Sequence, residues 1–590
     1  MKKLESIDNN SEIERQLVVE SVLDKKGDPI VGLHFIEKNQ ISKMIVVDGE
    51  DFDLNDKDGI WLDKRFADAN SLCVGDNISL NFNNLSITKE IKGLVYSPEY
   101  VYNPSPDGST PDFKKDGFAY LSYKSFPSYY DSVDDVPFNT ALVKTNMSLK
   151  TYENDLDKEL DGNYTEFLNS NDHISVNKFQ SEIEQHQMIG DVFPIVFDLV
   201  AILTLITTMA RIVSNQRIEI GILKSLGFKN NTIIKHYLSY GFWISLVASI
   251  LGLILGPITL PHLFYPPMQT FYSLPQWNPS YDISFLYLAI LMVIMSVVVS
   301  YLSVKVIARE KPVVSLSPKV SKSFKESFIE KSKFWNKLSF NFQWNFRDVN
   351  RNKVRGIMAI VGVIGCTALL ISAFGMYDAM DDVKGWLYND IDHYESKLTL
   401  DSGLSSSQIN HIVDEVDGEE IMESSIDIKY ANNKESAYLL VTEDDSLISI
   451  TNADREVISI PSKGVAITEK IADRLGAKIG DKIKWHIFGQ DKWVESEITE
   501  IYAHPSSQGI RLSKNELEDL GLNFTPTSII TKEKVENDYK GVKSISTKTD
   551  SIKSWDDLTE SMMIMVYVLI FFAVVLGFVV LYNLGLLSFT

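Results

Sequence analysis

VFPIVFDLVAILTLITTMARIVSNQRIEIGILKSLGFKNNTIIKHYLSY, residues 192–240, joins a membrane-spanning pattern directly to a basic, amphipathic one. About twenty mostly apolar residues come first, enough to cross a bilayer as a helix. A second apolar stretch follows the basic segment at once. Between them, a single acid, Glu219, stands among five bases: Arg211, Arg217, Lys224, Lys229 and Lys235. Because short basic loops between spans stay inside, the segment is predicted to lie on the cytoplasmic side.

The basic segment is also predicted to form a bent helix with an apolar face. Four apolar side chains fall on one helical face: Ile218, Ile222, Leu223 and Leu226. Gly227 offers a C-cap, after which Asn230 can start another turn. The two flanking spans hold the ends of this basic segment. Little conformational entropy is therefore lost if its helix docks into a groove on a soluble partner. The alternative is a charged connector lying on the lipid surface.

Residues 216–228, QRIEIGILKSLGF, resemble the coupling segment of the FtsX-like (MacB-type) ABC transporter permeases, usually R-x-E-I-G-x-L-K-A-L-G. In that family the segment transmits ATP-driven closure of a cytoplasmic ATPase to domains outside the membrane. The resemblance implies that ATP is bound by the partner subunit and that this chain needs no cofactor of its own. It also implies that seven residues meet the ATPase: Arg217, Glu219, Leu223, Lys224, Leu226, Gly227 and Phe228.

The hydropathy pattern predicts an α-helical, multi-pass protein of the cell membrane with two α+β extracytoplasmic domains. The family resemblance implies that these domains are of the MacB-like type. Five spans of suitable length are expected: residues 192–212, 241–260, 285–307, 357–376 and 562–581. The loop at 305–355 has thirteen Lys or Arg against four acids, so it is predicted to be cytoplasmic. The segment at 262–284 is aromatic without Lys or Arg, as expected of a short outer loop.

The predicted domain order follows from these spans. The chain is divided into an extracytoplasmic MacB-like domain ending in a stalk helix (1–188), an FtsX-like three-helix transmembrane domain (189–312) with its coupling helix at 213–239, a basic cytoplasmic linker (313–355), a fourth transmembrane helix (356–378), a second extracytoplasmic domain (379–559) and a fifth transmembrane helix (560–590). Family members have a membrane helix before the first domain and a second coupling segment after the last span. We therefore expect the chain to be the middle of a longer permease with duplicated halves.

An internal repeat links the two outer domains. Gly59–Leu80, GIWLDKRFADANSLCVGDNISL, aligns without a gap on Gly464–Trp485, GVAITEKIADRLGAKIGDKIKW, at a constant offset of 405. Six positions are identical: Gly59/Gly464, Ala67/Ala472, Asp68/Asp473, Gly75/Gly480, Asp76/Asp481 and Ile78/Ile483. The pattern resembles the core of MacB-like periplasmic domains.

Each copy of the repeat predicts a short helix followed by a Gly-Asp turn into a strand. Asp63 and Thr468 are the predicted N-caps, since both are short side chains that can accept a backbone hydrogen bond. The copies differ after the helix, where the first has Ser71 and the second has Gly476.

Composition and motifs exclude several functions. The net charge of −22 is carried mainly by the outer domains, and nucleic-acid binding needs a basic face. Cys73 and Cys366 are predicted to lie in an outer domain and in a span, so neither a disulfide nor a metal site is expected. The chain has no Gly-Lys dipeptide and hence no phosphate-binding loop, and no catalytic motif is visible. ATP hydrolysis is therefore assigned to another polypeptide.

Two features inside the spans are further candidates. Asp198 places a carboxylate in the first span, where it is costly; it either faces another part of the permease or reaches outer water. Gly252 and Gly256 form a G-x-x-x-G pattern in the second span, which permits close helix packing.

The predicted function is that of an ABC permease subunit acting through its outer domains on a lipoprotein, peptide, lipid or cell-wall enzyme. The predicted partners are a cytoplasmic ABC ATPase subunit and membrane lipids, without nucleic acid. The alternative is an ATPase-independent membrane sensor or scaffold whose acidic outer domains bind a ligand and whose basic loops hold anionic lipid. A membrane enzyme is a third class, for which the sequence offers no catalytic constellation.

Overall fold

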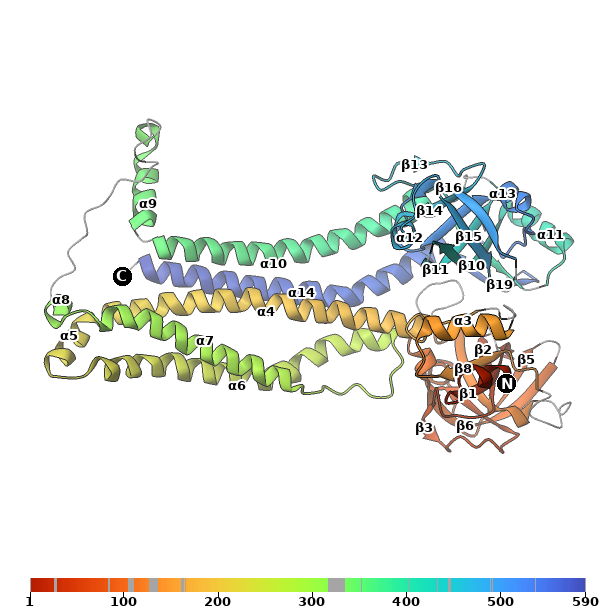
Figure 1. Cartoon of the computed structure of the whole chain (residues 1–590), viewed down its shortest axis with the longest axis horizontal. Helices are drawn as coiled ribbons and strands as arrows, with labels where there is room; N and C mark the ends of the chain where they lie inside the picture. Colours follow the sequence, from red (N-terminus) through yellow and green to blue (C-terminus); the bar gives the residue numbers. More distant parts are fainter. Residues whose placement is uncertain are drawn as a thin grey trace. The chain divides into compact units, whose positions relative to one another are not determined.

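The protein is described by a computed structural model (Figure 1). The described residues are 2–25, 29–82, 85–103, 111–126, 136–160, 164, 166–316, 330, 335–351, 353–401, 403–431, 433–443, 447–488, 490, 492–535, 537 and 539–588. They fall into two compact units. One comprises Met1–Ser181, Gln269–Gln276 and Ala379–Ser561, and the other comprises Glu182–Met268, Trp277–Asp378 and Met562–Thr590.

Long helices make up the second unit. Among the described residues, five helices are long and apolar enough to cross a membrane: α4 (Ile174–Asn215), α6 (Asn230–Phe271), α7 (Ile283–Ala308), α10 (Lys353–Gly385) and α14 (Lys548–Ser588). Each contains one of the predicted spans. The predicted stalks are continuous with their spans, because α4 begins before Ser175 and α14 begins well before Met562.

The outer loop predicted after the second span is partly helical. Helix α6 continues to Phe271, through Pro257, Pro261, Pro266 and Pro267, so half of the expected outer loop is helical. The predicted Gly252–Gly256 packing is also not seen, since no described atom would lie within 4 Å of a Cβ at either glycine. Close approach occurs instead at Gly241, where a Cβ would lie 2.1 Å from Ser300 Oγ.

The remaining helices are short. They are α1 (Lys2–Ile7), α2 (Lys64–Asn70), α3 (Leu149–Leu160), α5 (Arg217–Ser225), α8 (Pro312–Leu316), α9 (Phe340–Arg351), α11 (Ser406–Val416), α12 (Glu469–Leu475) and α13 (Lys514–Asp519). The linker predicted at 313–355 is thus partly helical, through α8, α9 and the start of α10. Residues 317–329 and 331–334 of that linker lie outside the described part of the chain.

The first outer domain is built on a closed β-barrel. Its strands are β1 (Glu12–Leu23), β2 (Ile30–Ile36), β3 (Ile45–Gly49), β4 (Gly59–Asp63), β5 (Asn77–Phe82), β6 (Leu85–Tyr96), β7 (Asp116–Ser122) and β8 (Thr140–Lys144). The order β2-β7-β4-β6-β5-β1 closes because β1 pairs again with β2. Apolar side chains fill the interior, with Leu33, Phe35 and Leu80 completely buried.

The second outer domain repeats this barrel. Its strands are β9 (Ser396–Leu400), β10 (Gly418–Tyr430), β11 (Asn433–Thr442), β12 (Ile450–Thr451), β13 (Val457–Ile458), β14 (Val465–Thr468), β15 (Lys482–Ile487), β16 (Val494–Tyr502), β17 (Gly509–Ser513), β18 (Ser528–Thr531) and β19 (Val542–Thr547). The order β11-β17-β14-β16-β15-β10 closes through β10 and β11. The strands of this closed path therefore each have a counterpart in the first barrel, in the same order.

The predicted repeat is confirmed down to single hydrogen bonds. The Gly75 N–H donates to Ile91 O at 2.8 Å, and the Gly480 N–H donates to Ile498 O at 2.8 Å. The parallel pairing of β4 with β6 shifts register after Ile60, and that of β14 with β16 shifts after Val465, again 405 residues apart. The two domains are therefore copies of one fold.

The predicted N-caps differ in detail. Asp63 Oδ1 accepts a hydrogen bond from the Arg65 N–H at 2.9 Å, as expected of a cap. Thr468 occupies the same position, but its hydroxyl accepts from the Gly509 N–H at 3.0 Å and makes no cap hydrogen bond. The second copy has thus exchanged a helix cap for a contact with a neighbouring strand.

Ser71→Gly is expected to stabilise the first barrel. Ser71 ends α2 with φ 54°, a left-handed conformation that costs a non-glycine residue about 1 kcal/mol, whereas Gly476 holds the equivalent position at φ 74°. Urea-dependent proteolysis of the full chain in detergent measures the change. The reciprocal Gly476→Ser should destabilise the second barrel by a similar amount; a change of the same sign for both substitutions would contradict this assignment.

Candidate functional site

Helix α5 lies between α4 and α6 and contains most of the predicted coupling residues. It ends in a Schellman motif: the Phe228 N–H donates to Leu223 O at 3.1 Å and the Gly227 N–H donates to Lys224 O at 3.0 Å. Gly227 has φ 92°, which explains why glycine is needed there. The C-cap and the restart at Asn230 are as predicted, but the single coupling helix at 213–239 is wrong, because three separate helices share that range.

One side of α5 is buried against its own unit. Ile220 packs in a cluster with Val213, Ile233, Tyr237 and Val304, which come from α4, α6 and α7. At Gly221 an added Cβ would lie 3.1 Å from Ser315 Cβ in α8. The glycine thus allows α8 to approach the backbone of α5.

Polar contacts also hold the buried side of α5 against the segment that follows α7. Arg217 Nε donates to Glu310 Oε2 at 2.8 Å, and Arg217 Nη2 donates to Val314 O at 2.7 Å. Lys224 Nζ donates to Glu310 O at 2.6 Å, and partial burial lowers the Lys224 pKa below its ordinary value. Glu310 therefore holds both ends of α5, through its carboxylate and its carbonyl.

The opposite side of α5 is exposed and largely apolar. Leu226 is 71% exposed and Ile218 59%, and the exposed residues include Ile218, Glu219, Ile222, Leu223, Leu226, Gly227 and Phe228. We call Ile218, Ile222, Leu223, Leu226 and Phe228 the apolar face of α5. The structure thus separates the seven predicted site residues: Arg217 and Lys224 point back to Glu310, and the other five are exposed.

Glu310→Ala is expected to loosen α5 without unfolding the chain. Loss of the partly exposed ion pair with Arg217 removes about 1 kcal/mol, which speeds local opening roughly fivefold. Hydrogen exchange of the α5 amides in the detergent-solubilised protein measures it. Arg309→Ala, an exposed neighbour, is the control; equal exchange rates in both variants would show that Glu310 does not hold α5.

Asp198, the predicted polar residue of the first span, lies in α4 and is partly exposed. Within the described part of the chain it has no hydrogen bond or ion pair, so its role stays a prediction.

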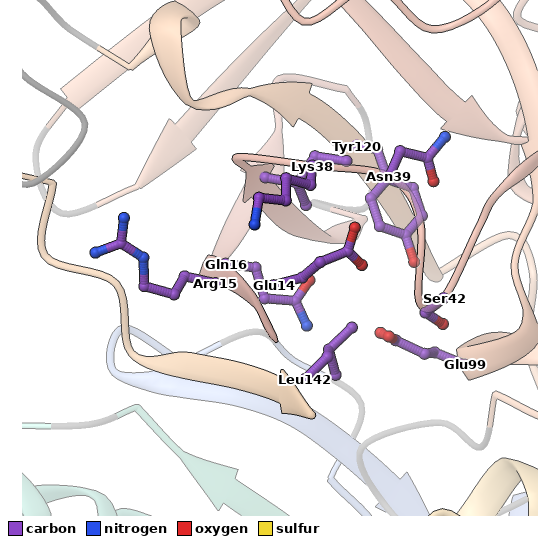
Figure 2. Close-up of a pocket in the computed structure, with 10 residues that line it drawn as sticks. Glu14, Arg15, Gln16, Lys38, Asn39, Ser42, Glu99, Tyr120 and Leu142 are labelled. Atoms are coloured by element: carbon purple, nitrogen blue, oxygen red, sulfur yellow. The ribbon is translucent and has the colours of Figure 1, made fainter. Parts of the chain in front are cut away.

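The first barrel contains a polar pocket, but its side chains are already paired (Figure 2). Both carboxylate oxygens of Glu14 accept backbone N–H groups, from Gln40 and Ile41. Gln16 Oε1 lies 3.0 Å from Nδ1 of His34, whose pKa falls to about 4 because the ring is buried. These contacts tie β1 to β2 and to the following loop, which is a structural role.

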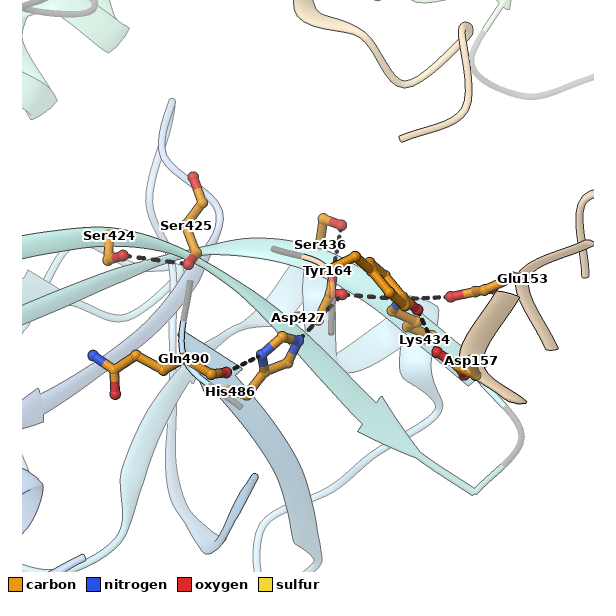
Figure 3. Close-up of polar contacts among 10 residues, drawn as sticks. All are labelled: Glu153, Asp157, Tyr164, Ser424, Ser425, Asp427, Lys434, Ser436, His486 and Gln490. Carbon is orange, nitrogen blue, oxygen red and sulfur yellow. Dashed lines mark hydrogen bonds and ion pairs between the residues drawn. The ribbon is translucent and has the colours of Figure 1, made fainter. Parts of the chain in front are cut away.

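A second polar cluster joins the N-terminal domain to the second barrel (Figure 3). Lys434 Nζ lies 2.6 Å from Glu153 Oε1 of α3 and 2.9 Å from Asp427 Oδ2 of β10. Asp427 also accepts from Ser436 Oγ at 2.7 Å, and His486 Nε2 lies 3.6 Å away. Lysine neutralises the carboxylates, and no group of His, Cys, Asp or Glu among the described residues could hold a metal ion. The apolar face of α5 remains the strongest candidate site.

Comparison with known proteins bears on this segment. The family model described as FtsX-like permease C-terminal matches residues 192–312, which contain the second half of α4 and the whole of α5, α6 and α7. A search of curated proteins gave no match. Members of this family are typically non-catalytic permease subunits of ABC transporters. Over residues 192–312, the chain is therefore similar to the FtsX-like permease family.

Proposed function

We propose that this chain is the permease subunit of an FtsX/MacB-type ABC transporter, and that its α5 receives the movement of a separate cytoplasmic ATPase. The outer barrels then act on a lipoprotein, peptide, lipid or cell-wall enzyme outside the membrane. The observation that carries the proposal is the two-sided character of α5. One side is fixed by Ile220, Gly221 and the Glu310 contacts, and the other exposes the apolar face.

A rigid, exposed apolar helix is suited to receiving force. Because its backbone is already ordered, docking costs little conformational entropy, and buried apolar area stabilises the complex. The contacts of Arg217 and Lys224 with the Glu310 region mean that a push on α5 moves α8 and the end of α7 with it. Arg217 and Lys224 therefore serve to position the docking surface rather than to form it.

The continuity of α4 with the first outer domain supports the proposal that movement of α5 reaches the outer barrels. Helix α4 runs unbroken from Ile174 to Asn215, one residue before Gln216 caps α5. At its start, buried Ser175 accepts a hydrogen bond from the Tyr102 N–H at 3.0 Å. The Ser273 N–H, in the segment that follows α6, donates to Val101 O at 2.7 Å, so the start of α4 and this segment contact neighbouring residues of the first outer domain.

A pull-down from detergent-solubilised native membranes tests the proposal. The tagged chain should recover an ATP-binding polypeptide, and Gly227→Leu should reduce recovery because leucine at φ 92° disrupts the turn behind Leu226. Stable chain with no ATP-binding polypeptide, together with ligand-dependent changes in the outer barrels, would favour the sensor or scaffold instead.

A further inference from the structure

The end of α10 departs from a regular α-helix where it enters the second outer domain. Helix α10 continues without a break into a π-helical turn, Trp386–Ile391, after which the Asp392 N–H donates to Leu387 O at 2.8 Å. Turns of this kind are rare and frequently occur at functional sites. Sequence analysis did not predict this turn, which joins a candidate span to a barrel.

A hairpin of the second outer domain contacts the π turn. Strands β12 and β13 pair with each other outside the closed path of the barrel, and the loop between them contains Arg455. Arg455 has φ 64°, a left-handed conformation that residues other than glycine rarely adopt. Asn452 stabilises this loop, because its carbonyl accepts from the Arg455 N–H at 3.0 Å and its Oδ1 accepts from the Glu456 N–H at 2.9 Å. A strained residue that several hydrogen bonds hold in place indicates a role for its side chain.

The Arg455 side chain contacts α10 and the π turn together. Its two Nη atoms donate to the two carboxylate oxygens of Asp382, with Nη1 2.9 Å from Oδ1. Its guanidinium carbon lies 5.0 Å from the centroid of the Trp386 ring. A bidentate pair beside an aromatic ring fixes direction as well as distance. Trp386 Nε1 also donates to Thr451 Oγ1 at 2.9 Å, so the hairpin holds this helix end at two points.

The same hairpin is anchored to the barrel. Thr451 forms an antiparallel bridge with Ala503, whose N–H donates to Thr451 O at 2.8 Å directly after the end of β16. One residue before β12, the Ser449 N–H donates to Ile391 O at 2.9 Å. A continuous series of contacts therefore runs from Asp382 through the hairpin to a barrel strand.

The described residues of the first outer domain do not repeat this arrangement. The offset of 405 places Glu50 at the position of Arg455, and a glutamate cannot pair with a carboxylate as arginine does. Glu50 O accepts from Trp61 Nε1 at 2.8 Å, and β3, the counterpart of β12, pairs with β6 in the barrel sheet. The contact with a membrane helix is therefore specific to the second copy.

We propose that residues 450–458 form a clasp that locks the second barrel to α10, so that helix and barrel move as one body. Arg455 is the positioning residue of the clasp, and Asp382 and Trp386 are its contacts on the helix. Opening the clasp lets Arg455 relax from its left-handed conformation, so backbone strain favours release while the side-chain contacts favour closure. The clasp shares no residue with α5 and does not depend on ATPase docking there.

The test measures how firmly α10 and the second barrel are joined. In a Cys73→Ser, Cys366→Ala background, nitroxide labels are placed on Ala379→Cys and Lys484→Cys, exposed positions of α10 and of β15. Double electron–electron resonance of the reconstituted full chain then gives the distribution of their separations. Hydrogen exchange of the π-turn amides is the second readout.

The variants separate the clasp from the general stability of the barrel. Arg455→Ala and Asp382→Asn each remove the ion pair, and the exchange of Asp382→Arg with Arg455→Asp restores it with the charges reversed. Aspartate also tolerates the left-handed conformation better than most residues do. Arg474→Ala, which removes another exposed ion pair of the same barrel, with Glu435, is the matched control.

Arg455→Ala and Asp382→Asn should broaden the distance distribution about twofold and speed exchange of the π turn roughly tenfold. The charge-exchanged protein and Arg474→Ala should both resemble the parent chain. A distribution as narrow in Arg455→Ala as in the parent would overturn the proposal, because helix and barrel would then be joined without the clasp. Equal broadening in Arg474→Ala, or no recovery in the charge-exchanged protein, would overturn it too, since Arg455 would then act only on the folding of the barrel.

Discussion

Leu226→Asp is expected to weaken binding of the cytoplasmic ATPase by at least about tenfold. Leu226 is the most exposed member of the apolar face, and its side chain supports no described contact within the chain. Aspartate at this position places a charge in an interface that must exclude water, so the charge is buried unpaired or the surfaces stay apart. Co-purification at graded salt and protein concentrations measures the affinity.

Val457→Asp is the matched control for Leu226→Asp. Val457 is a similarly exposed apolar residue, 63% exposed, in the second outer domain. It should leave ATPase binding unchanged, whereas Ile222→Asp should reproduce the defect. If Leu226→Asp and Val457→Asp retain the same affinity as the parent chain, the apolar face of α5 does not meet the ATPase.

Asp63→Asn is expected to stabilise the first barrel increasingly as pH rises. Burial raises the pKa of Asp63 from 3.8 to about 7, although hydrogen bonds with the backbone of Arg65 and Phe66 and the Arg65 charge oppose the shift. The folded state therefore binds the proton more tightly than the unfolded state, and the parent protein loses stability between about pH 4 and pH 7. Asp63→Asn removes the ionisable group. The difference in free energy of unfolding between this variant and the parent protein should therefore grow, in favour of the variant, by up to about 1.4 kcal/mol per pH unit.

Comparing Asp63→Asn with the parent protein at each pH isolates the effect of Asp63 ionisation on stability. His34, with its pKa lowered to about 4, changes stability in the opposite direction, since a buried neutral histidine favours folding as pH rises through that window. It is present in both proteins and cancels. Urea-dependent proteolysis of the first barrel at pH 4 to 8 gives the difference. A difference that is constant with pH would show that Asp63 is ionised normally in the folded state.

Much of the local structure could be predicted from sequence. The spans follow from long apolar runs, and the turn at Gly227 follows from a helical pattern that stops at glycine. The repeat at offset 405 predicted two related domains because Gly75 and Gly480 mark the same turn. These signals are local, so short windows of sequence contain them.

The structural features that could not be predicted depend on contacts between residues far apart in the sequence. Glu310 is 93 residues from Arg217, and no local pattern shows that they pair. Lys224 was assigned to the ATPase because family resemblance gives positions but not side-chain directions. Barrel closure requires β1 and β2 to meet β5 and β7 across long separations. Proline is a poor guide in α6, since helix breakers are tolerated in membrane helices whose neighbours satisfy the freed backbone groups.

Photo-crosslinking from the apolar face of α5 tests whether this face contacts a cytoplasmic ATPase. Benzoylphenylalanine replaces Leu226 or Ile222 in the full chain, with Val457 as the control position, and native membranes are irradiated with and without ATP. Positions 226 and 222 are expected to capture a polypeptide with a phosphate-binding loop, identified by mass spectrometry, and position 457 is not. Crosslinks from 226 and 222 only to lipid, in membranes where the chain is folded, would contradict it.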